Sequence, residues 1–468
     1  MKILTILFLS IFMSQTFGAS KKSPEKKAVR KVASLGPSKY TEQILNFRST
    51  QDVTKFLGQF KGAADDTEGA VYKALSGPLL ALKGIYWRSN KIVSRVKLLD
   101  NTIDSSLNRY YSNFDIRPSH IPHIANYFVS KSKGQFNKIS DFQNFSISKL
   151  VPLIGKSVES LDKIIEAKKN DEGNPALFQL DLATIYGEKR VENLINKKSR
   201  YLDIYVSDLI LLKGFLNDLR GSLAYFSSYN LNGIDKMISV FRGYMVLGQT
   251  KQFLSRIKGK KRSMTNHQSV QHGKTKMLKL LKRGYLYKNL FTLRNVSYGG
   301  KHALQWSREY FLKGVQNKIA SLKMSNKNLE ESQVKRSRRF EIQSFNNFFK
   351  LSLKHLKLKE ELLKGPMVVH DRLFTENVKV NTTALFNPNN PYVKDLKKLM
   401  PNANNFQVRK HNFQQDKKIK VKTGLPSLDL GGLLPGVKNF EELKRKKFLL
   451  IQRAGVGFPL GTWLTVLI

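Results

Sequence analysis

Residues 209–223 read LILLKGFLNDLRGSL, and five of the six leucines recur at alternating intervals of three and four residues. This period places five side chains on one face of an α-helix: Leu209, Leu212, Leu216, Leu219 and Leu223. A second stripe with the same period consists of Leu150, Ile154, Val158, Leu161 and Ile165. A helix with one apolar face buries that face against its neighbours, so both stretches predict core-facing helices of a bundle or array.

Residues 275–365 have the same helical character, with an apolar face that includes Phe345, Phe349, Leu353, Leu356 and Leu363. Gly365-Pro366 ends this pattern, because proline cannot donate a backbone hydrogen bond. The remaining sequence contains NPNNPY (387–392), an alternating KIKVK (418–422) and the Gly-rich TGLPSLDLGGLLPG (423–436), which predict turns and a few short strands. The predicted fold class is therefore mainly α: a helical bundle or array in two units with an irregular, partly β C-terminal region.

Prolines and charge divide the chain into segments. Helix breaks are expected at Gly77-Pro78, between Pro118 and Pro122, and at Asn174-Pro175, since proline disfavours the helical conformation of the residue before it. The predicted order is a signal peptide (1–18), a basic flexible tail (19–38), a helical domain (39–250), a basic linker (251–274), a second helical unit (275–365) and the irregular C-terminal region (366–468).

The first 18 residues, MKILTILFLSIFMSQTFG, have the pattern of a secretory signal peptide. Lys2 precedes an uncharged run of about eleven residues, which is too short for a spanning helix of about 20. Thr16 and Gly18 suit the −3 and −1 positions of a cleavage site. We therefore expect an exported protein, periplasmic or extracellular after cleavage. The chain has no cysteine, which excludes disulfides, cysteine-ligated metals and a cysteine nucleophile.

Charge is the most unusual property of the sequence. The chain of 468 residues has 81 basic and 35 acidic side chains, a formal net charge of +46. Residues 236–308 contain 17 basic side chains and no acidic one. Such a block favours a negatively charged partner, because basic side chains displace the counterions of a polyanion. We call residues 236–308 the acid-free block.

Aromatic residues accompany the cations of the acid-free block, and stacking rings beside basic side chains are typical of polyanion binding. The residues predicted to make the electrostatic contacts are Lys258, Lys260, Lys261, Arg262, Lys276, Lys279, Lys282 and Arg283, with Tyr285 and Tyr287 for stacking. The sequence thus predicts a non-enzymatic binding or scaffolding protein of the bacterial envelope that contacts an anionic polymer. Two alternatives remain: contact with an anionic membrane surface, and lysines that only cover solvated helix faces.

An enzymatic alternative rests on three short motifs. Ser160-Leu161-Asp162-Lys163, Ser228-Tyr229-Asn230 and Lys422-Thr423-Gly424 occur in the order used by penicillin-recognising serine enzymes. In that interpretation Ser160, Lys163, Ser228, Asn230 and Lys422 form the site of a periplasmic cell-wall hydrolase. Ser-x-x-Lys occurs seven times in this lysine-rich chain, and the fold would need a central sheet that few strand signals support before residue 366.

Other motifs are incomplete. Gly273-Lys274-Thr275 resembles the end of a phosphate-binding loop, but Gln268 stands where the motif needs its first glycine. His120 and His123 have metal-ligand spacing without a clear third ligand, so no metal and no cofactor is predicted. The uncharged tail 454–468 is expected to pack as a terminal strand, or to dock on another envelope protein.

Overall fold

The computed structural model describes residues 38, 40–60, 66–93, 120–170, 176–181, 183–186, 201–234, 289–331, 353–370, 377–399, 429–437 and 442. These residues are mainly α-helical, which confirms the predicted class. The strands among them form three separate two-stranded antiparallel sheets. The predicted signal peptide, the tail 19–37, most of the acid-free block and the uncharged tail 454–468 lie outside the described residues.

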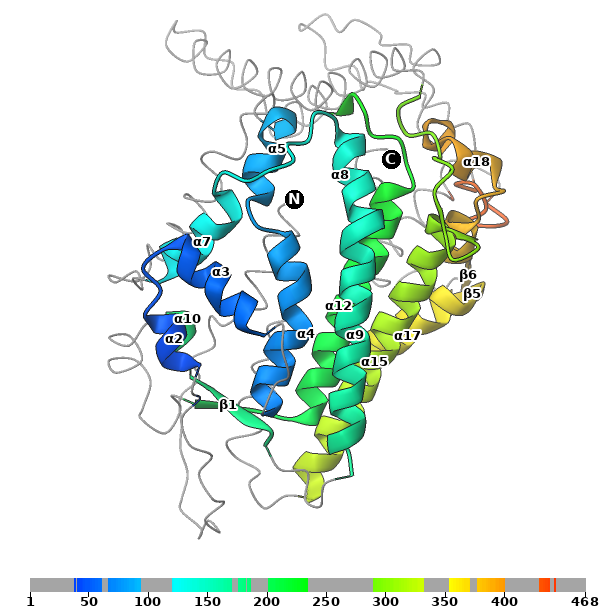
Figure 1. The fold of residues 1–468 in the computed structure, drawn as a ribbon. Helices are drawn as coiled ribbons and strands as arrows, with labels where there is room; N and C mark the ends of the chain where they lie inside the picture. The colour runs from blue at the N-terminus through cyan, green and yellow to red at the C-terminus, as the bar shows by residue number, and fades with distance from the viewer. Residues whose placement is uncertain are drawn as a thin grey trace, which may run out of the picture.

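Long helices that lie side by side form the centre of the fold (Figure 1). Helix α12 packs between α9 and α15, while α4 packs against α9 and α17 packs against α15. The bounds are α4 (Thr67–Ala81), α9 (Val151–Lys168), α12 (Val206–Ser227), α15 (Ala303–Glu331) and α17 (Leu353–Lys364). Because α12 and α15 pack along each other, the two predicted helical units contact each other through their longest helices. The division into two units stays a prediction.

Both predicted apolar stripes lie in the core. All five residues of the 150–165 stripe are buried, as are four of the five leucines on α12, while Leu212 is half-buried. In the second helical region, Leu356 of α17 packs with Val315, Ile319 and Leu322 of α15. The residues predicted at 345 and 349 lie outside the described part of the chain. Helix α17 ends at Lys364, as the Gly365-Pro366 pair predicts.

Short helices surround this centre. Around a second core of Tyr40, Phe56, Leu79 and Tyr127 lie α2 (Thr41–Leu45), α3 (Thr50–Gln59) and α7 (Ile121–Val129). Asp66 begins α4, where its carboxylate accepts a hydrogen bond from the Gly69 amide at 2.5 Å. The others are α5 (Ile85–Val93), α8 (Ile139–Phe145), the π-helical turn η2 (Ser146–Leu150) that joins α8 to α9, and α10 (Ala183–Tyr186).

The predicted helix break at Gly77-Pro78 is wrong. Helix α4 continues through Pro78 to Ala81. Proline already has a helical φ and removes only its own amide from the hydrogen-bond ladder. Here it stands in the last turn, where its carbonyl still accepts from the Leu82 amide at 3.1 Å. The helix therefore ends one turn later than the proline predicts.

The strands are short, and the C-terminal elements are compact. The pairs are β1 (Phe178–Asp181) with β2 (Tyr201–Ile204), β3 (Ser297–Tyr298) with β4 (Lys301–His302), and β5 (Met367–His370) with β6 (Asn377–Val380). Strand β6 leads into the 3-10 helix η4 (Thr382–Phe386), α18 (Pro391–Lys394) and the 3-10 helix η5 (Leu396–Leu399). The turns at 429–437 use Gly431, Gly432 and Gly436 at positive φ, in agreement with the predicted Gly-rich turns.

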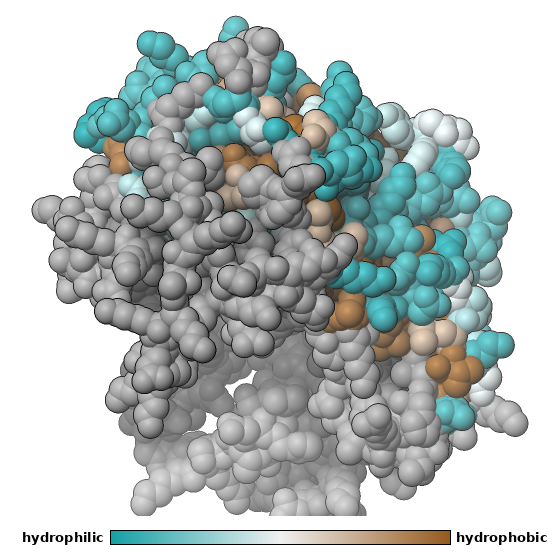
Figure 2. Space-filling view, turned by 90° about the horizontal axis from the view of Figure 1, so that it is seen from below, coloured by the Kyte–Doolittle hydropathy of each residue, from teal (hydrophilic) through white to brown (hydrophobic). Residues whose placement is uncertain are grey.

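The described surface is mostly polar. Figure 2 shows one face; among the residues coloured there, hydrophilic ones predominate and apolar ones occur in small groups. Among the described residues, the large hydrophobic side chains that are exposed are Tyr298 and Val368. No helix in this part of the chain combines the length and apolar character needed to cross a membrane.

Candidate anion-binding site

The ten residues predicted for polyanion contact, from Lys258 to Tyr287, lie outside the described residues. The C-terminal end of the acid-free block, residues 289–308, is described. It forms a turn, the β3–β4 hairpin and the first residues of α15. Lys301 and Arg308, two cations of the same block, therefore show how its end meets the fold.

The two chain segments that flank residues 235–288 are paired with each other. The Asn230 amide donates to the Thr292 carbonyl at 2.8 Å, and the Phe291 amide donates to the Asn230 carbonyl at 2.7 Å. The Arg294 amide donates to the Ser228 carbonyl at 2.8 Å. Tyr229 and Phe291 are both buried in the small core beneath this contact. The described residues on the two sides of 235–288 therefore lie next to each other.

Lys301 combines an ion pair with an aromatic contact. Its Nζ lies 2.6 Å from Glu309 Oε1 and 5.1 Å from the centre of the Trp306 ring. The indole N–H of Trp306 donates to the Tyr298 carbonyl, and the two rings lie 6.2 Å apart. Tyr298 is 43% exposed. This end of the acid-free block thus has a cation beside rings, which is the combination expected of the whole block.

Arg308 connects two helices at the edge of the same site. Its Nε donates to the Leu363 carbonyl at 2.7 Å, and an Nη donates to the Lys364 carbonyl at 2.7 Å. These carbonyls end α17, where no further helical amide is available and the helix dipole favours a cation. Arg308 therefore has a fixed position, with part of its guanidinium still available for other contacts.

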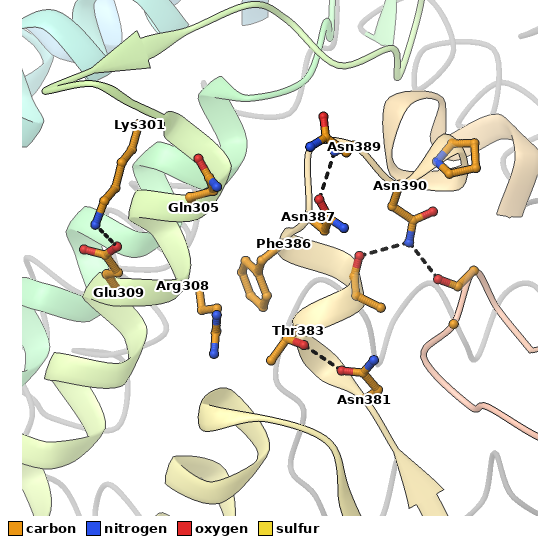
Figure 3. Close-up of a pocket in the computed structure, with 14 residues that line it drawn as sticks. Lys301, Gln305, Arg308, Glu309, Asn381, Thr383, Phe386, Asn387, Asn389 and Asn390 are labelled. Carbon is orange, nitrogen blue, oxygen red and sulfur yellow. Dashed lines mark hydrogen bonds and ion pairs between the residues drawn. The ribbon is translucent and has the colours of Figure 1, made fainter.

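A pocket of about 840 Å³ lies between α15 and the segment from η4 to α18 (Figure 3). Lys301, Gln305, Arg308 and Glu309 of the hairpin and α15 line one side. The other side and the base are formed by Asn381, Thr383, Ala384, Phe386, Asn387, Asn389, Asn390, Pro391, Gly431 and Gly432. The volume is within the range of roughly 300–1,000 Å³ that is usual for small-molecule pockets.

Asn390 holds the pocket wall together. Its Nδ2 donates to the Ala384 carbonyl at 3.0 Å and to the Gly431 carbonyl at 2.8 Å, while its Oδ1 accepts from the Tyr392 amide at 3.0 Å. All of its hydrogen-bonding groups are thus used within the protein. The side chain joins η4, α18 and the turn at 429–437 into one rigid wall.

The sequence did not predict this pocket. The asparagines of NPNNPY predict only a turn, and Asn390 does precede α18 as its capping residue. The signal that was available is composition, because Asn is four of the ten residues from 381 to 390. That this segment faces Lys301 and Arg308 across one pocket depends on packing, which no local pattern reveals.

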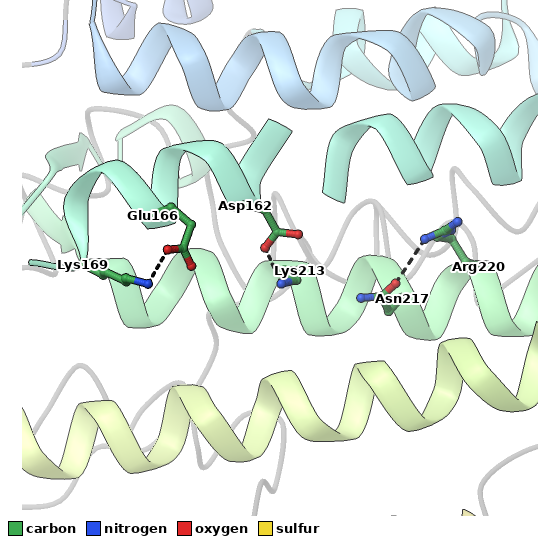
Figure 4. Close-up of polar contacts among 6 residues, drawn as sticks. All are labelled: Asp162, Glu166, Lys169, Lys213, Asn217 and Arg220. Atoms are coloured by element: carbon green, nitrogen blue, oxygen red, sulfur yellow. Dashed lines mark hydrogen bonds and ion pairs between the residues drawn. The ribbon is translucent and has the colours of Figure 1, made fainter. Parts of the chain in front are cut away.

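The four described residues of the serine-enzyme alternative are not brought together. Asp162, two residues from Ser160 on α9, pairs with Lys213 of α12 (Figure 4). Ser228 lies beyond the far end of α12, about 20 Å from that point at about 1.5 Å per residue. It is buried, and its Oγ donates to the Ala224 carbonyl at 2.8 Å. Asn230 accepts from the Asn232 amide in a turn, Lys163 is exposed on α9, and Lys422 lies outside the described residues.

His120 has a structural partner. Its side chain is buried, and Nε2 lies 2.7 Å from the Thr184 carbonyl. Since a carbonyl only accepts, Nε2 carries the proton and donates. His123 of α7 is half-buried, and the acidic residue nearest to this pair in the sequence, Asp115, lies outside the described residues. Among the described side chains, no group of three His, Asp or Glu residues could hold a metal ion.

Burial lowers the pKa of His120 below its ordinary value, and the positive charge of Arg48 acts in the same direction. The unfolded chain then binds a proton at a higher pH than the folded chain. We expect the free energy of unfolding to decrease as the pH falls below about 6.5, by at most about 1.4 kcal/mol per pH unit from this group. Urea unfolding at pH 7.5 and 5.5 measures this, and His120→Gln should reduce the difference. The same pH dependence in both proteins would contradict the assignment.

Comparisons with known proteins add no relative: no family model matches the chain, and no curated protein and no solved structure is significantly similar to it.

Proposed function

We propose that this chain is an exported, non-enzymatic binding or scaffolding protein of the bacterial envelope that contacts an anionic polymer through the acid-free block. The observation that carries the proposal is the block itself, with 17 basic and no acidic side chains in residues 236–308. A run of like charge of this length attracts polyanions strongly, because each contact releases counterions from the polymer.

The distribution of charge supports a localised contact. The described residues hold 31 of the 81 basic side chains and 20 of the 35 acidic ones. The described body is therefore only moderately basic, and most of the excess positive charge belongs to other parts of the sequence. A chain whose lysines served solubility alone would distribute them more evenly over its folded body.

The paired flanks of residues 235–288 support the proposal in a second way. Because Asn230 and Thr292 are hydrogen-bonded, both ends of this segment are attached to one place on the helical body. Lys301 and Arg308 lie close to that place in the sequence and line the pocket. A polymer that contacts this end of the block would therefore lie next to the pocket.

Retention of the mature chain on a polygalacturonate matrix tests the proposal. We expect retention to decrease steeply with salt, and reversal of Lys258, Lys260, Lys261 and Arg262 to glutamate should lower the slope of log affinity against log salt by roughly three. The control reverses four exposed lysines of the described body: Lys55, Lys131, Lys133 and Lys156. Equal losses from the two sets would mean that only total charge matters. Binding to anionic vesicles but not to the matrix would favour a membrane surface.

A further inference from the structure

Besides Asn390, three amide side chains in the pocket have their oxygen atoms engaged within the protein. Gln305 Oε1 accepts from the His302 amide at 3.1 Å, and Asn387 Oδ1 accepts from the Asn389 amide at 3.0 Å. Asn381 Oδ1 is bonded to the Thr383 hydroxyl at 2.6 Å. A backbone amide can only donate, so the orientations of Gln305 and Asn387 are fixed by these bonds. The ends of these side chains that remain available are NH2 groups.

The groups that these three amides leave available are therefore donors. The pocket also contains acceptors, since Asn389 has a side-chain oxygen and Glu309 uses only Oε1 in its bond to Lys301. Within the part of the chain that the structure describes, the NH2 groups of Gln305, Asn381 and Asn387 have no protein partner. Arg308 adds the N–H groups that its two bonds to α17 leave over, since a guanidinium has five. A ligand with many acceptor atoms matches this set, whereas a ligand rich in donors would leave these groups unpaired.

The charges of the pocket restrict the ligand further. Lys301 and Glu309 form an ion pair and offset each other, which leaves Arg308 as the uncompensated charge among the lining residues described. One guanidinium suits one carboxylate, with which it can form two parallel hydrogen bonds. The neutral amides suit uncharged oxygens such as hydroxyls. Half-buried Phe386 provides an apolar ring on the same wall.

From these features we propose that the pocket binds a carboxylated sugar unit, such as a hexuronic acid, of an anionic polysaccharide. The inference rests on the proposed function and names the polymer class. Arg308 holds the carboxylate, the three amide NH2 groups donate to hydroxyl or ring oxygens, and Phe386 contacts the apolar face of the sugar. The acid-free block supplies charge attraction, while the pocket selects the chemical unit.

Substitution of Asn387 by aspartate gives a sharp test, because the shape of the side chain is unchanged. Asn387→Asp keeps an oxygen for the Asn389 amide but replaces the donor by a negatively charged acceptor. We expect tri-galacturonic acid to bind the mature full-length chain at least about tenfold more weakly in this variant, by isothermal titration calorimetry. Gln305→Glu, which keeps its oxygen for the His302 amide, should have a similar effect.

The matched control is Asn137→Asp. Asn137 is exposed, its Oδ1 accepts from Lys91 Nζ at 3.0 Å, and it does not line the pocket. This variant has the same change in charge and should bind tri-galacturonic acid within about twofold of the unaltered chain. Thermal unfolding of all variants verifies that they remain folded.

The possible results separate the two proposals. Two results would overturn the pocket assignment and leave the proposed function standing. In the first, the chain is retained on polygalacturonate but does not bind tri-galacturonic acid. In the second, the pocket variants and the control variant bind tri-galacturonic acid equally well. Equally tight binding of a phosphate-bearing oligomer such as tripolyphosphate at the pocket would overturn the carboxylated sugar. If the unaltered chain is not retained on polygalacturonate at all, the proposed function itself is rejected.

Discussion

Replacement of Asp218 by alanine is expected to lower the free energy of unfolding by about 3 kcal/mol. Asp218 of α12 forms an ion pair with Lys318 of α15, whose side chain is only 8% exposed. Lys359 of α17 is near enough for the charge of Lys318 to lower its pKa, in addition to the larger effect of burial, while Asp218 raises it. Without Asp218 the two ammonium groups lose their shared anion. Asp218 is 29% exposed, so solvent screens part of the loss.

Chemical denaturation with a second substitution shows whether charge is the cause. Lys318→Met in the Asp218→Ala background should recover more than half of the loss, because the buried cation is then removed. The deficit of Asp218→Ala should also shrink between pH 7 and pH 10. The lowered pKa of Lys359 means that this side chain loses its proton at a lower pH than an ordinary lysine. Its repulsion with Lys318 then disappears. Additive losses and a constant deficit would contradict this explanation.

Asp162→Ala is the matched control for Asp218→Ala. Like Asp218, Asp162 pairs with a lysine of a neighbouring helix: Asp162 is on α9 and its partner Lys213 is on α12 (Figure 4). Its side chain is 43% exposed, and its partner is more accessible than Lys318. Exposed pairs contribute little, so we expect a loss below about 1 kcal/mol. The comparison isolates the effect of burial on two ion pairs of the same helix bundle.

Replacement of Gly314 by alanine is the second change expected to have a large effect, about 3 kcal/mol of destabilisation. An added Cβ would overlap Asp218 Oδ1 and lie 3.0 Å from the Gly214 carbonyl oxygen. The methyl group would push α12 and α15 apart and displace Asp218 from Lys318. Alanine is the better helix former by about 1 kcal/mol, but that gain is smaller than the expected steric and electrostatic loss.

Gly58→Ala provides the control for this substitution. Gly58 is also inside a helix, α3, and an added Cβ there would meet no atom within 4 Å. We expect this variant to be as stable as the unaltered chain or up to about 1 kcal/mol more stable. Thermal or urea unfolding of both variants measures the difference. A stable Gly314→Ala protein would show that the close approach of the two helices is not needed.

Local periodicity predicted the core but not the contacts between helices. The stripe from Leu209 to Leu223 has the helical period, which predicts one buried face of α12. It does not predict that Gly214 and Gly221 are also buried, against α15. The close approach of Gly214 to Gly314 and the ion pair of Asp218 with Lys318 join residues about 100 apart. One sequence contains no record of such pairs, because charge and small size have many uses on a helix surface.

For the candidate site, too, the sequence predicts the local property but not the contacts between distant segments. The excess of positive charge in residues 236–308 is visible from composition, and its partner of opposite sign follows from elementary electrostatics. The pocket is different because Gln305, Asn387 and Gly432 come from three separate segments. Its donor character depends on which amide oxygens are already bonded, and that is a property of the folded chain.

The hydrogen bonds between Asn230 and residues 291–292 have a consequence for the evolution of the chain. These bonds, and the neighbouring one between Ser228 and Arg294, are made entirely by residues 228–230 and 291–294. Exchanges of amino acids within 235–288 therefore leave the atoms of this junction unchanged. Ligand preference can thus diverge among related chains while the junction of the helical body is retained.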